Sequence, residues 1–245
     1  MYRKHPDIIT PNGNSIIWKY MGLDKFLYLL TKRTLFFSRL SSMSDKYEGR
    51  LPNNMFNQNL KSHTLFTEKD FKEHKRERKE IEKFRDFTFI NCWTINRNES
   101  FALWKIYLGG ARSGVAIKST VGKLKKSLKE DSPDLFIGKV NYTDRFSKYP
   151  PSKEQLTLTK MPFYTYEDEL RVFYTAPDDF ESLESDPVFE EFSGWYTNIN
   201  ILELIDKIYL SPFAGHWLRS AIKSILYKVE PLLLERLAKS DIKDE

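Results

Sequence analysis

The chain has 245 residues, a formal net charge of +5, and aromatic side chains at 15% of its positions. An aromatic-rich chain of this length can bury a sizeable core, so the composition excludes a disordered protein. The charge is too small to identify a polyanionic partner by itself. A single cysteine, Cys92, excludes an intramolecular disulfide and favours the cytoplasm. No apolar run reaches the roughly 18 residues that span a bilayer, so we expect no membrane partner.

Strand and helix patterns follow one another irregularly along the chain. β-branched and aromatic content predicts strands at 16–20, 34–38, 88–93, 114–117, 137–142 and 170–174. Helical spacing of apolar residues predicts helices capped by Asp24, at 68–86, 101–108 and 121–128, and from Phe213 and Pro231 onward, while 199–210 fits a strand or a helix. This order predicts an α+β fold with a mixed, mainly antiparallel sheet core and short flanking helices.

No internal repeat and no Gly/Ser- or Pro-rich linker interrupts these elements. We therefore expect a single domain over 1–245, with a core at about 16–226, a charged helical insertion at about 66–86 and C-terminal helices at 212–240. The segment 68–86 holds eight basic and seven acidic residues, which is typical of a solvated helix rather than a nucleic-acid stripe. An acidic loop is expected at 178–191.

Common catalytic motifs are absent. The four histidines are far apart, and neither His-x-x-x-His nor Cys-x-x-Cys spacing occurs. The chain also lacks the phosphate-binding pattern Gly-x-x-x-x-Gly-Lys-Ser/Thr and the nucleophile pattern Gly-x-Ser-x-Gly. These absences disfavour metal hydrolases, nucleoside triphosphatases and serine hydrolases, and we assign no metal ligand.

The segment Glu167-x-Glu169-x-Arg171 groups side chains that can carry chemistry. Alternate residues of a strand share a face, so we expect these three to point one way and Leu170 and Val172 to point into the core. Arg171 can keep one carboxylate ionised while the pKa of the other rises, which makes a general base or an anion that stabilises positive charge. The alternative, which the residue types favour, is an exposed ladder of ion pairs on an edge strand.

Three further features have two interpretations each. Trp104 and Tyr107 fall on one side of their helix and form either a stacking wall for a flat ring or, more often, part of a core. The turn 109–114, with Arg112, presents N–H groups to a phosphate or simply joins a helix to a strand. A basic patch at 118–129 is a solvated helix face or a nucleic-acid contact; its lysines are Lys118, Lys123, Lys125, Lys126 and Lys129.

Several short motifs occur together in one known family. They are Lys19-Tyr20, Leu35-Phe36-Phe37-Ser38, Asp45-x-x-Glu48-Gly49, Cys92-Trp93, Trp104-x-x-Tyr107, Gly114-Val115-Ala116-Ile117, Val140-x-Tyr142 and Tyr166-Glu167-x-Glu169-x-Arg171. In this order, over roughly 16–226, they resemble the bacterial and phage family catalogued as domain of unknown function 2971. That resemblance implies domain boundaries but no activity.

The order of elements is also similar to the ADP-ribosyltransferase fold, in which a late strand opens with Glu-x-Glu. This resemblance implies NAD as the substrate, with Glu169 acting at the nicotinamide ribose and Glu167 orienting or activating the acceptor. The cofactor-binding residues that it implies are Lys19 for the pyrophosphate, Tyr20 or Trp104 for stacking on the nicotinamide, Thr94 or Ser38 for the ribose, and also Tyr107 and Arg171.

The leading hypothesis is therefore a cytoplasmic ADP-ribosyltransferase-like effector or toxin, of the kind used in antiphage defence, that modifies a nucleic acid or a protein. Two alternatives stay open. One is a non-catalytic module that binds nucleic acid through 118–129 or a protein through its acidic loop. The other is a nuclease that holds Mg²⁺ between Glu167, Glu169 and Asp45.

The transferase hypothesis carries a geometrical expectation. Lys19, Thr94, Trp104 and Glu169 should line one cleft of the folded chain.

Overall fold

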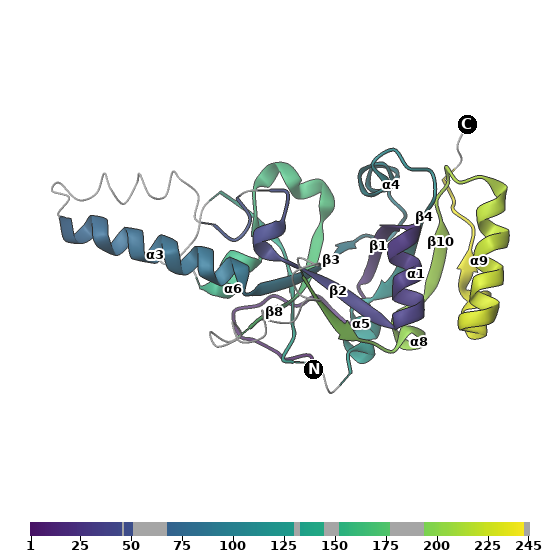
Figure 1. The fold of residues 1–245 in the computed structure, drawn as a ribbon, viewed down its shortest axis with the longest axis horizontal. Helices are drawn as coiled ribbons and strands as arrows, with labels where there is room; N and C mark the ends of the chain where they lie inside the picture. The colour runs from purple at the N-terminus through teal and green to yellow at the C-terminus, as the bar shows by residue number, and fades with distance from the viewer. Residues whose placement is uncertain (46, 51–67, 130–132, 145–151, 177–193, 243–245) are drawn as a thin grey trace.

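The structure is a computed structural model that describes residues 1–45, 47–50, 68–129, 133–144, 152–176 and 194–242. Within these residues nine strands form one large sheet, and two short strands form a second sheet. The large sheet runs in the order β11-β10-β4-β1-β3-β2-β9, and β8 and β5 extend it from the other edge of β3. Helices lie on both sides of the large sheet (Figure 1).

The large sheet consists of β1 (Ile16–Gly22), β2 (Thr34–Arg39), β3 (Thr88–Ile95), β4 (Gly114–Thr120), β5 (Phe136–Lys139), β8 (Glu169–Thr175), β9 (Gly194–Asn198), β10 (Lys207–Leu210) and β11 (Leu237–Ala238). The small sheet pairs β6 (Asn141–Tyr142) with β7 (Thr159–Lys160). The α-helices are α1 (Leu23–Lys32), α3 (Glu68–Asp86), α4 (Phe101–Leu108), α5 (Val121–Ser127), α6 (Lys153–Thr157), α8 (Ile201–Leu204) and α9 (His216–Val229). The 3₁₀-helices are η1 (Leu40–Ser42), η2 (Pro162–Glu167) and η4 (Pro231–Arg236).

The pairs of the large sheet are antiparallel except for β10 with β11. The strand β3 is central, because it pairs with β1 and β2 on one edge and with β8 on the other. In this register Thr94 lies between Trp18 and Glu169, and Cys92 lies opposite Arg171. The expected α+β fold, with a mixed, mainly antiparallel sheet and flanking helices, is confirmed.

One face of the sheet carries the main apolar core. Alternate strand residues point to it, such as Ile17 and Met21 of β1. The helices α1, α5, α8 and α9 cover this face with apolar residues at helical spacing, for example Leu218, Ile222 and Leu226 of α9. Burial of this face specifies the strand register, because a shift by one residue would reverse the two faces.

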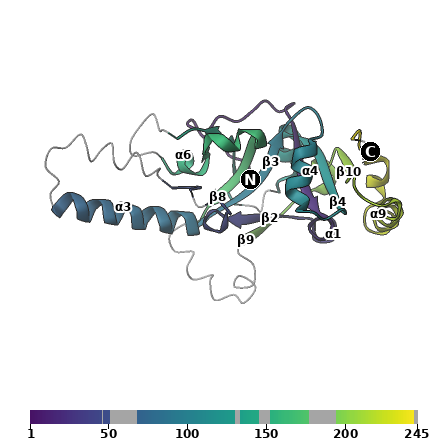
Figure 2. The ribbon, with the colours of Figure 1, turned by 90° about the horizontal axis from the view of Figure 1, so that it is seen from above.

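The opposite face carries two smaller apolar clusters. The first joins Trp18 and Tyr20 of β1 to Trp104 of α4. The second joins Phe173 of β8 to Phe84 in the last turn of α3. The rest of α3 projects away from the sheet, as the two views at 90° agree (Figures 1 and 2). The strand positions between the two clusters carry charged side chains.

The capping residues predicted from the sequence are confirmed in α4 but not in α1. In α4 the Ser100 side chain accepts the N–H of Leu103, and Gly109 ends the helix with φ at 55°. In α1 the N-cap is Gly22, so the expectation that Asp24 caps this helix is wrong. Asp24 instead lies in the first turn, where a negative charge is favourable.

Three segments differ from the expected boundaries. Residues 137–142 divide into β5 and β6, and 199–210 divides into α8 and β10 after Asn200 caps α8. The C-terminal helix begins at His216, because Phe213 is buried in the turn before it.

The predicted acidic loop 178–191 lies outside the described residues. Among the residues that the structure describes, no helix combines the length and the apolar character needed to cross a bilayer.

The main core predicts a stability difference between two isoleucines. Ile117 of β4 is 0% exposed, whereas Ile9 is 79% exposed. We expect Ile117→Ala to lower the free energy of unfolding by about 2–5 kcal/mol, because it leaves a cavity beneath α1 and α5. The matched Ile9→Ala variant should change it by less than about 0.5 kcal/mol. Urea denaturation measures both, and equal losses would contradict the assignment of the core.

Candidate active site

Arg171 is fully buried at the centre of a charged cluster. Its Nε and Nη2 donate to the two carboxylate oxygens of Glu169, at 2.9 and 3.0 Å. Nη2 also donates to Glu48 Oε2 at 2.7 Å, and Nη1 donates to the Thr157 carbonyl at 2.7 Å. A guanidinium that is 0% exposed and shared by two carboxylates is a buried ion network. The expectation of an exposed ladder of ion pairs is therefore wrong.

Lys160 of β7 brings a third carboxylate into the cluster. Its Nζ lies 2.7 Å from Glu167 Oε2, 3.1 Å from Glu48 Oε1 and 3.5 Å from Glu169 Oε2. The same Nζ lies 4.6 Å from the centre of the Tyr164 ring. The side chain of Glu167 is 16% exposed, against 3% for Glu48 and 4% for Glu169. Glu167 is therefore the carboxylate of the three that solvent or a ligand reaches most easily.

Asp168, which has a left-handed backbone conformation, lies between the two glutamates and allows both to approach Lys160. Glu167 ends η2 and Glu169 begins β8, while Asp168 between them has φ at 39°. Aspartate adopts this region more readily than most residues. Its own carboxylate turns away to Lys139, at 2.8 Å. The expectation that Glu167 shares a strand face with Glu169 is wrong, because Glu167 reaches Lys160 from the end of a helix.

The turn after η1 holds Glu48 in the cluster. The N–H of Tyr47 donates to Asp45 Oδ1 at 2.9 Å, and the N–H of Glu48 donates to the Asp45 carbonyl at 3.2 Å. Gly49 has φ at 70°, and a Cβ there would lie 2.6 Å from a leucine side chain. Arg85, in the last turn of α3, donates from Nε to the Glu48 carbonyl at 2.9 Å. The motif Asp45-x-x-Glu48-Gly49 thus has a structural explanation.

The two glutamates of the Glu-x-Glu motif have opposite pKa shifts. Burial by itself raises the pKa of a carboxyl group, but the charge and hydrogen bonds of Arg171, together with Lys160, lower the pKa of Glu169 to about 2. At Glu167 burial outweighs the hydrogen bond from Lys160, and the charges of Glu169 and Glu48 add to it, so its pKa is raised. Glu169 stays ionised at neutral and mildly acidic pH, whereas Glu167 can exchange a proton closer to neutral pH.

Tyrosines surround the exposed side of Glu167. Tyr166 is 53% exposed and hydrogen-bonds to Glu167, and Tyr164 is half-buried against Lys160. Tyr107 of α4 is 45% exposed, and its hydroxyl is close enough to the cluster for the charges of Glu169, Glu167 and Lys160 to act on it. Burial there, with nearby charges that include Glu169, raises the pKa of Tyr107. We call these three tyrosines, Tyr107, Tyr164 and Tyr166, the aromatic rim.

One buried oxygen beside the rim lacks a partner. Asp45 is 8% exposed, and its Oδ2 accepts no hydrogen bond from the described residues. Burial and the charge of Asp45 raise the pKa of Tyr164, which places this carboxylate next to the rim. A buried acceptor of this kind is satisfied when a ligand supplies a donor.

Lys19, the residue predicted to bind the pyrophosphate, lies on the other face of the sheet. Lys19 alternates with Tyr20 along β1, and its Nζ lies 5.5 Å from the centre of the Trp93 ring. It donates to the Cys92 carbonyl at 2.8 Å, and burial lowers the pKa of Lys19 to about 8. Glu169 belongs to the opposite face, and although its charge partly offsets the lowering of the Lys19 pKa, the hydrogen bond and the ring contact of Lys19 go to Cys92 and Trp93 and not to Glu169.

The predicted stacking residues separate into core and surface. Tyr20 is 3% exposed and Trp104 is 0% exposed, and their rings meet edge to face with centroids 5.0 Å apart. Trp104 Nε1 also donates to Glu99 at 2.8 Å. Of the predicted pair on α4, Tyr107 offers surface to a ligand, whereas Trp104 is a core residue.

The expected cleft of Lys19, Thr94, Trp104 and Glu169 does not form. Thr94 is buried directly opposite Glu169, and Ser38 lies opposite Ile90, four residues away along β3. Of the predicted residues, the structure brings together Glu167, Glu169 and Arg171, with Thr94 and Tyr107 beside them. It adds three residues to this group: Glu48, Lys160 and Tyr142. The Tyr142 hydroxyl accepts the N–H of Glu169. Sequence reasoning selected none of these three additions, although Glu48 and Tyr142 belong to the motifs of the family resemblance.

The Mg²⁺ hypothesis gains no support from this geometry. The position among the carboxylates of Glu48, Glu167 and Glu169 holds the Lys160 ammonium group. In the described parts of the chain, no group of three or more His, Cys, Asp or Glu side chains is arranged to hold a metal ion.

Comparison of the chain with protein-family models, with curated proteins and with solved structures finds no match. The two family resemblances seen in the sequence stay predictions, and the site is interpreted from its geometry.

The lowered pKa of Glu169 predicts a pH-dependent contribution to stability. Because its pKa is lower in the folded chain than the ordinary 4.5, the contribution is complete above about pH 4.5 and is lost as the pH falls toward about 2. We expect Glu169→Gln to lower the free energy of unfolding at pH 7 by on the order of 3 kcal/mol, and by less at pH 3.

Urea denaturation at pH 7, 4 and 3 measures this difference. The matched control is Glu203→Gln, because Glu203 is exposed on α8. The control should stay within about 0.5 kcal/mol of the parent at each pH. A Glu169→Gln deficit that does not shrink on acidification would show that the ionised carboxylate is not the stabilising species.

Proposed function

We propose that the chain is an ADP-ribosyltransferase-like enzyme that cleaves NAD between nicotinamide and ribose, with Glu167 as its catalytic carboxylate. The observation that carries this proposal is the pair of glutamates with opposite pKa shifts, one locked in the interior and one at the aromatic rim. Two carboxyl groups whose pKa values are driven apart are typical of acid–base pairs at active sites.

The charge of the cluster suits this reaction. Cleavage of the glycosidic bond leaves the electron pair on nicotinamide and positive charge on the ribose. Four carboxylates, those of Asp45, Glu48, Glu167 and Glu169, lie near two cations, Lys160 and Arg171. The surplus of negative charge at a partly dry site stabilises a developing cation, and it disfavours a reaction that builds up negative charge.

The proposed step is a substitution at the ribose C1′ atom. The C–N bond to nicotinamide breaks, and nicotinamide leaves with the electron pair as a neutral molecule. A hydroxyl or amine of the acceptor forms the new bond to C1′, and Glu167 takes the proton that the acceptor loses. A raised pKa makes Glu167 a stronger base for this transfer than an ordinary carboxylate.

The roles of the two glutamates differ from those that the resemblance implies. Glu169 shares both oxygens with Arg171, so we assign it a positioning role: its charge helps to raise the pKa of Glu167 and holds Lys160. The Asp45 Oδ2 atom, which no described residue hydrogen-bonds, is suited to accept a ribose hydroxyl. The aromatic rim offers ring faces to the nicotinamide or the adenine.

The acceptor in this proposal is a nucleic acid or a protein. The chain would act in the cytoplasm, as an effector or toxin of the antiphage kind. These assignments rest on the resemblance to the ADP-ribosyltransferase fold, which is a fold-level analogy.

The proposal is tested by nicotinamide release from NAD. We expect Glu167→Gln to slow the release by about 100-fold or more, because the substitution keeps the shape of the side chain and removes the base. The matched control is Asp168→Asn, which removes a neighbouring carboxylate and keeps a residue type that tolerates the left-handed conformation. It should retain the parental rate within about threefold, since the Asp168 carboxylate faces Lys139.

Two results would overturn the proposal. One is a wild-type chain that releases no nicotinamide while it binds a macromolecule, which would favour the non-catalytic binding module. The other is equal activity of Glu167→Gln and Asp168→Asn, which would exclude Glu167 as the base.

A further inference from the structure

The outer face of α9 has an unbalanced charge. The helix carries Arg219, Lys223 and Lys228 on exposed positions, and His216–Val229 contains no Asp or Glu. The longer exposed helix α3, in contrast, holds eight basic and seven acidic residues. Within the described residues, no ion pair engages the three cations of α9. Helix α9 lies at the edge of the molecule, at the opposite end from α3 (Figure 1).

Two large aromatic side chains lie on the exposed side of α9. Trp217 is 75% exposed and Tyr227 is 70% exposed. The two residues are ten positions apart, which is about 15 Å along the helix axis and about 80° around it. Small side chains, Ser220 and Ser224, lie between them, and the Trp217 ring lies against the His216 ring with centroids 4.1 Å apart.

Lys223 lies one turn from Tyr227, whereas Arg219 and Lys228 lie on the two opposite margins of the exposed side. We call the exposed side of α9, with its two aromatic residues and the cations within and beside it, the α9 surface.

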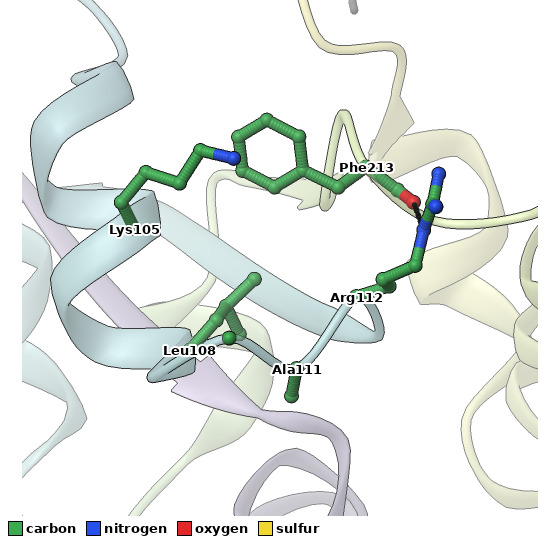
Figure 3. A pocket seen from close by; sticks show the side chains of 6 residues that line it. Lys105, Leu108, Ala111, Arg112 and Phe213 are labelled. Atoms are coloured by element: carbon green, nitrogen blue, oxygen red, sulfur yellow. Dashed lines mark hydrogen bonds between the residues drawn. The ribbon is translucent and has the colours of Figure 1, made fainter.

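Two cavities border the turn before α9, and each has two cationic side chains in its lining. The larger, of about 250 Å³, is lined by His216, Arg219 and Lys239 among others. The smaller, of about 150 Å³, lies between α4 and the turn and is lined by Lys105 and Arg112 (Figure 3).

The smaller cavity is built around Phe213. Figure 3 shows the Lys105 ammonium against the Phe213 ring, 3.7 Å from its centre, and Arg112 on the other side of the cavity. Arg112 Nε donates to the Phe213 carbonyl at 2.8 Å. The turn that precedes α9 thus carries positive charge on both of its sides.

Several lysines of the predicted basic patch at 118–129 make contacts within the fold. Lys123 forms an ion pair with Asp206, and Lys125 lies 4.2 Å from the centre of the Tyr2 ring. Lys118 lies 5.4 Å from the centre of the Trp18 ring. Three lysines of that patch therefore serve contacts within the fold, and the α9 surface is the better candidate for a polyanion.

We propose that the α9 surface binds single-stranded nucleic acid. Phosphates would pair with Arg219, Lys223 and Lys228, and unpaired bases would stack on Trp217 and Tyr227. Exposed aromatic faces favour single strands over a duplex, because only unpaired bases offer their ring faces.

Charge also attracts anionic membranes, but the helix does not suit them. The apolar face of α9 is buried against the sheet through Leu218, Ile222 and Leu226, so it is not available for insertion between lipids. The proposal concerns binding without NAD, and it is independent of the proposed function.

Fluorescence anisotropy with labelled single-stranded oligonucleotides of uridine and of thymidine tests the proposal, in a series of salt concentrations without NAD. We expect the wild-type affinity to fall as salt rises. The triple variant Arg219→Gln, Lys223→Gln, Lys228→Gln should bind at least about tenfold more weakly and lower the salt slope by about two. Trp217→Ala should bind at least about fivefold more weakly with an unchanged salt slope.

The matched control is the double variant Lys126→Gln, Lys129→Gln, which removes exposed cations from the patch at 118–129. It should change the affinity by less than about twofold, because it leaves the α9 surface intact. Thermal unfolding checks that each variant is folded, which we expect since the substituted side chains are exposed. An absence of binding to either oligonucleotide, an equal loss in the control, or tighter binding to a duplex or to phosphatidylserine vesicles would overturn the proposal.

Discussion

The buried guanidinium of Arg171 is the interaction on which the second face of the sheet depends. It joins β8 to the turn of Glu48 and to the last residue of α6, Thr157, which are far apart in the chain. A cation at this depth is tolerated because its hydrogen bonds go to two carboxylates and a carbonyl. The same contacts that keep it there keep Glu169 ionised, so packing and electrostatics of the candidate site have one origin.

Most of the elements could be predicted from local patterns, whereas the cluster could not. β-branched runs identified the central strands, and Ser100 and Gly109 marked the ends of α4, because these signals act between neighbours in sequence. Glu48 lies 123 residues from Arg171, and no spacing rule connects them. Alternation along β1 places Lys19 and Tyr20 on opposite faces of the sheet. Because both faces are covered by apolar side chains, the sequence did not indicate which face the site would occupy.

Charge is divided between two regions of the molecule. The candidate active site gathers more carboxylates than cations beside the aromatic rim, and the α9 surface gathers cations alone. The net charge of +5 conceals this division, because it averages the two regions with the balanced helix α3. A negative site that favours a developing cation and a positive surface that favours phosphates are different requirements, and the fold keeps them on different elements.

The helix α3 connects the buried cluster around Arg171 and Glu48 to the periphery of the molecule. It has 19 residues, which is about 28 Å of rigid rod, and its last turn is anchored by Phe84 in the apolar cluster and by Arg85 on the Glu48 carbonyl. A rod fixed at one end acts as a lever, so a small tilt of the projecting end rotates the anchored turn. Through Arg85, the orientation of α3 is tied to the turn that carries the Glu48 carboxylate.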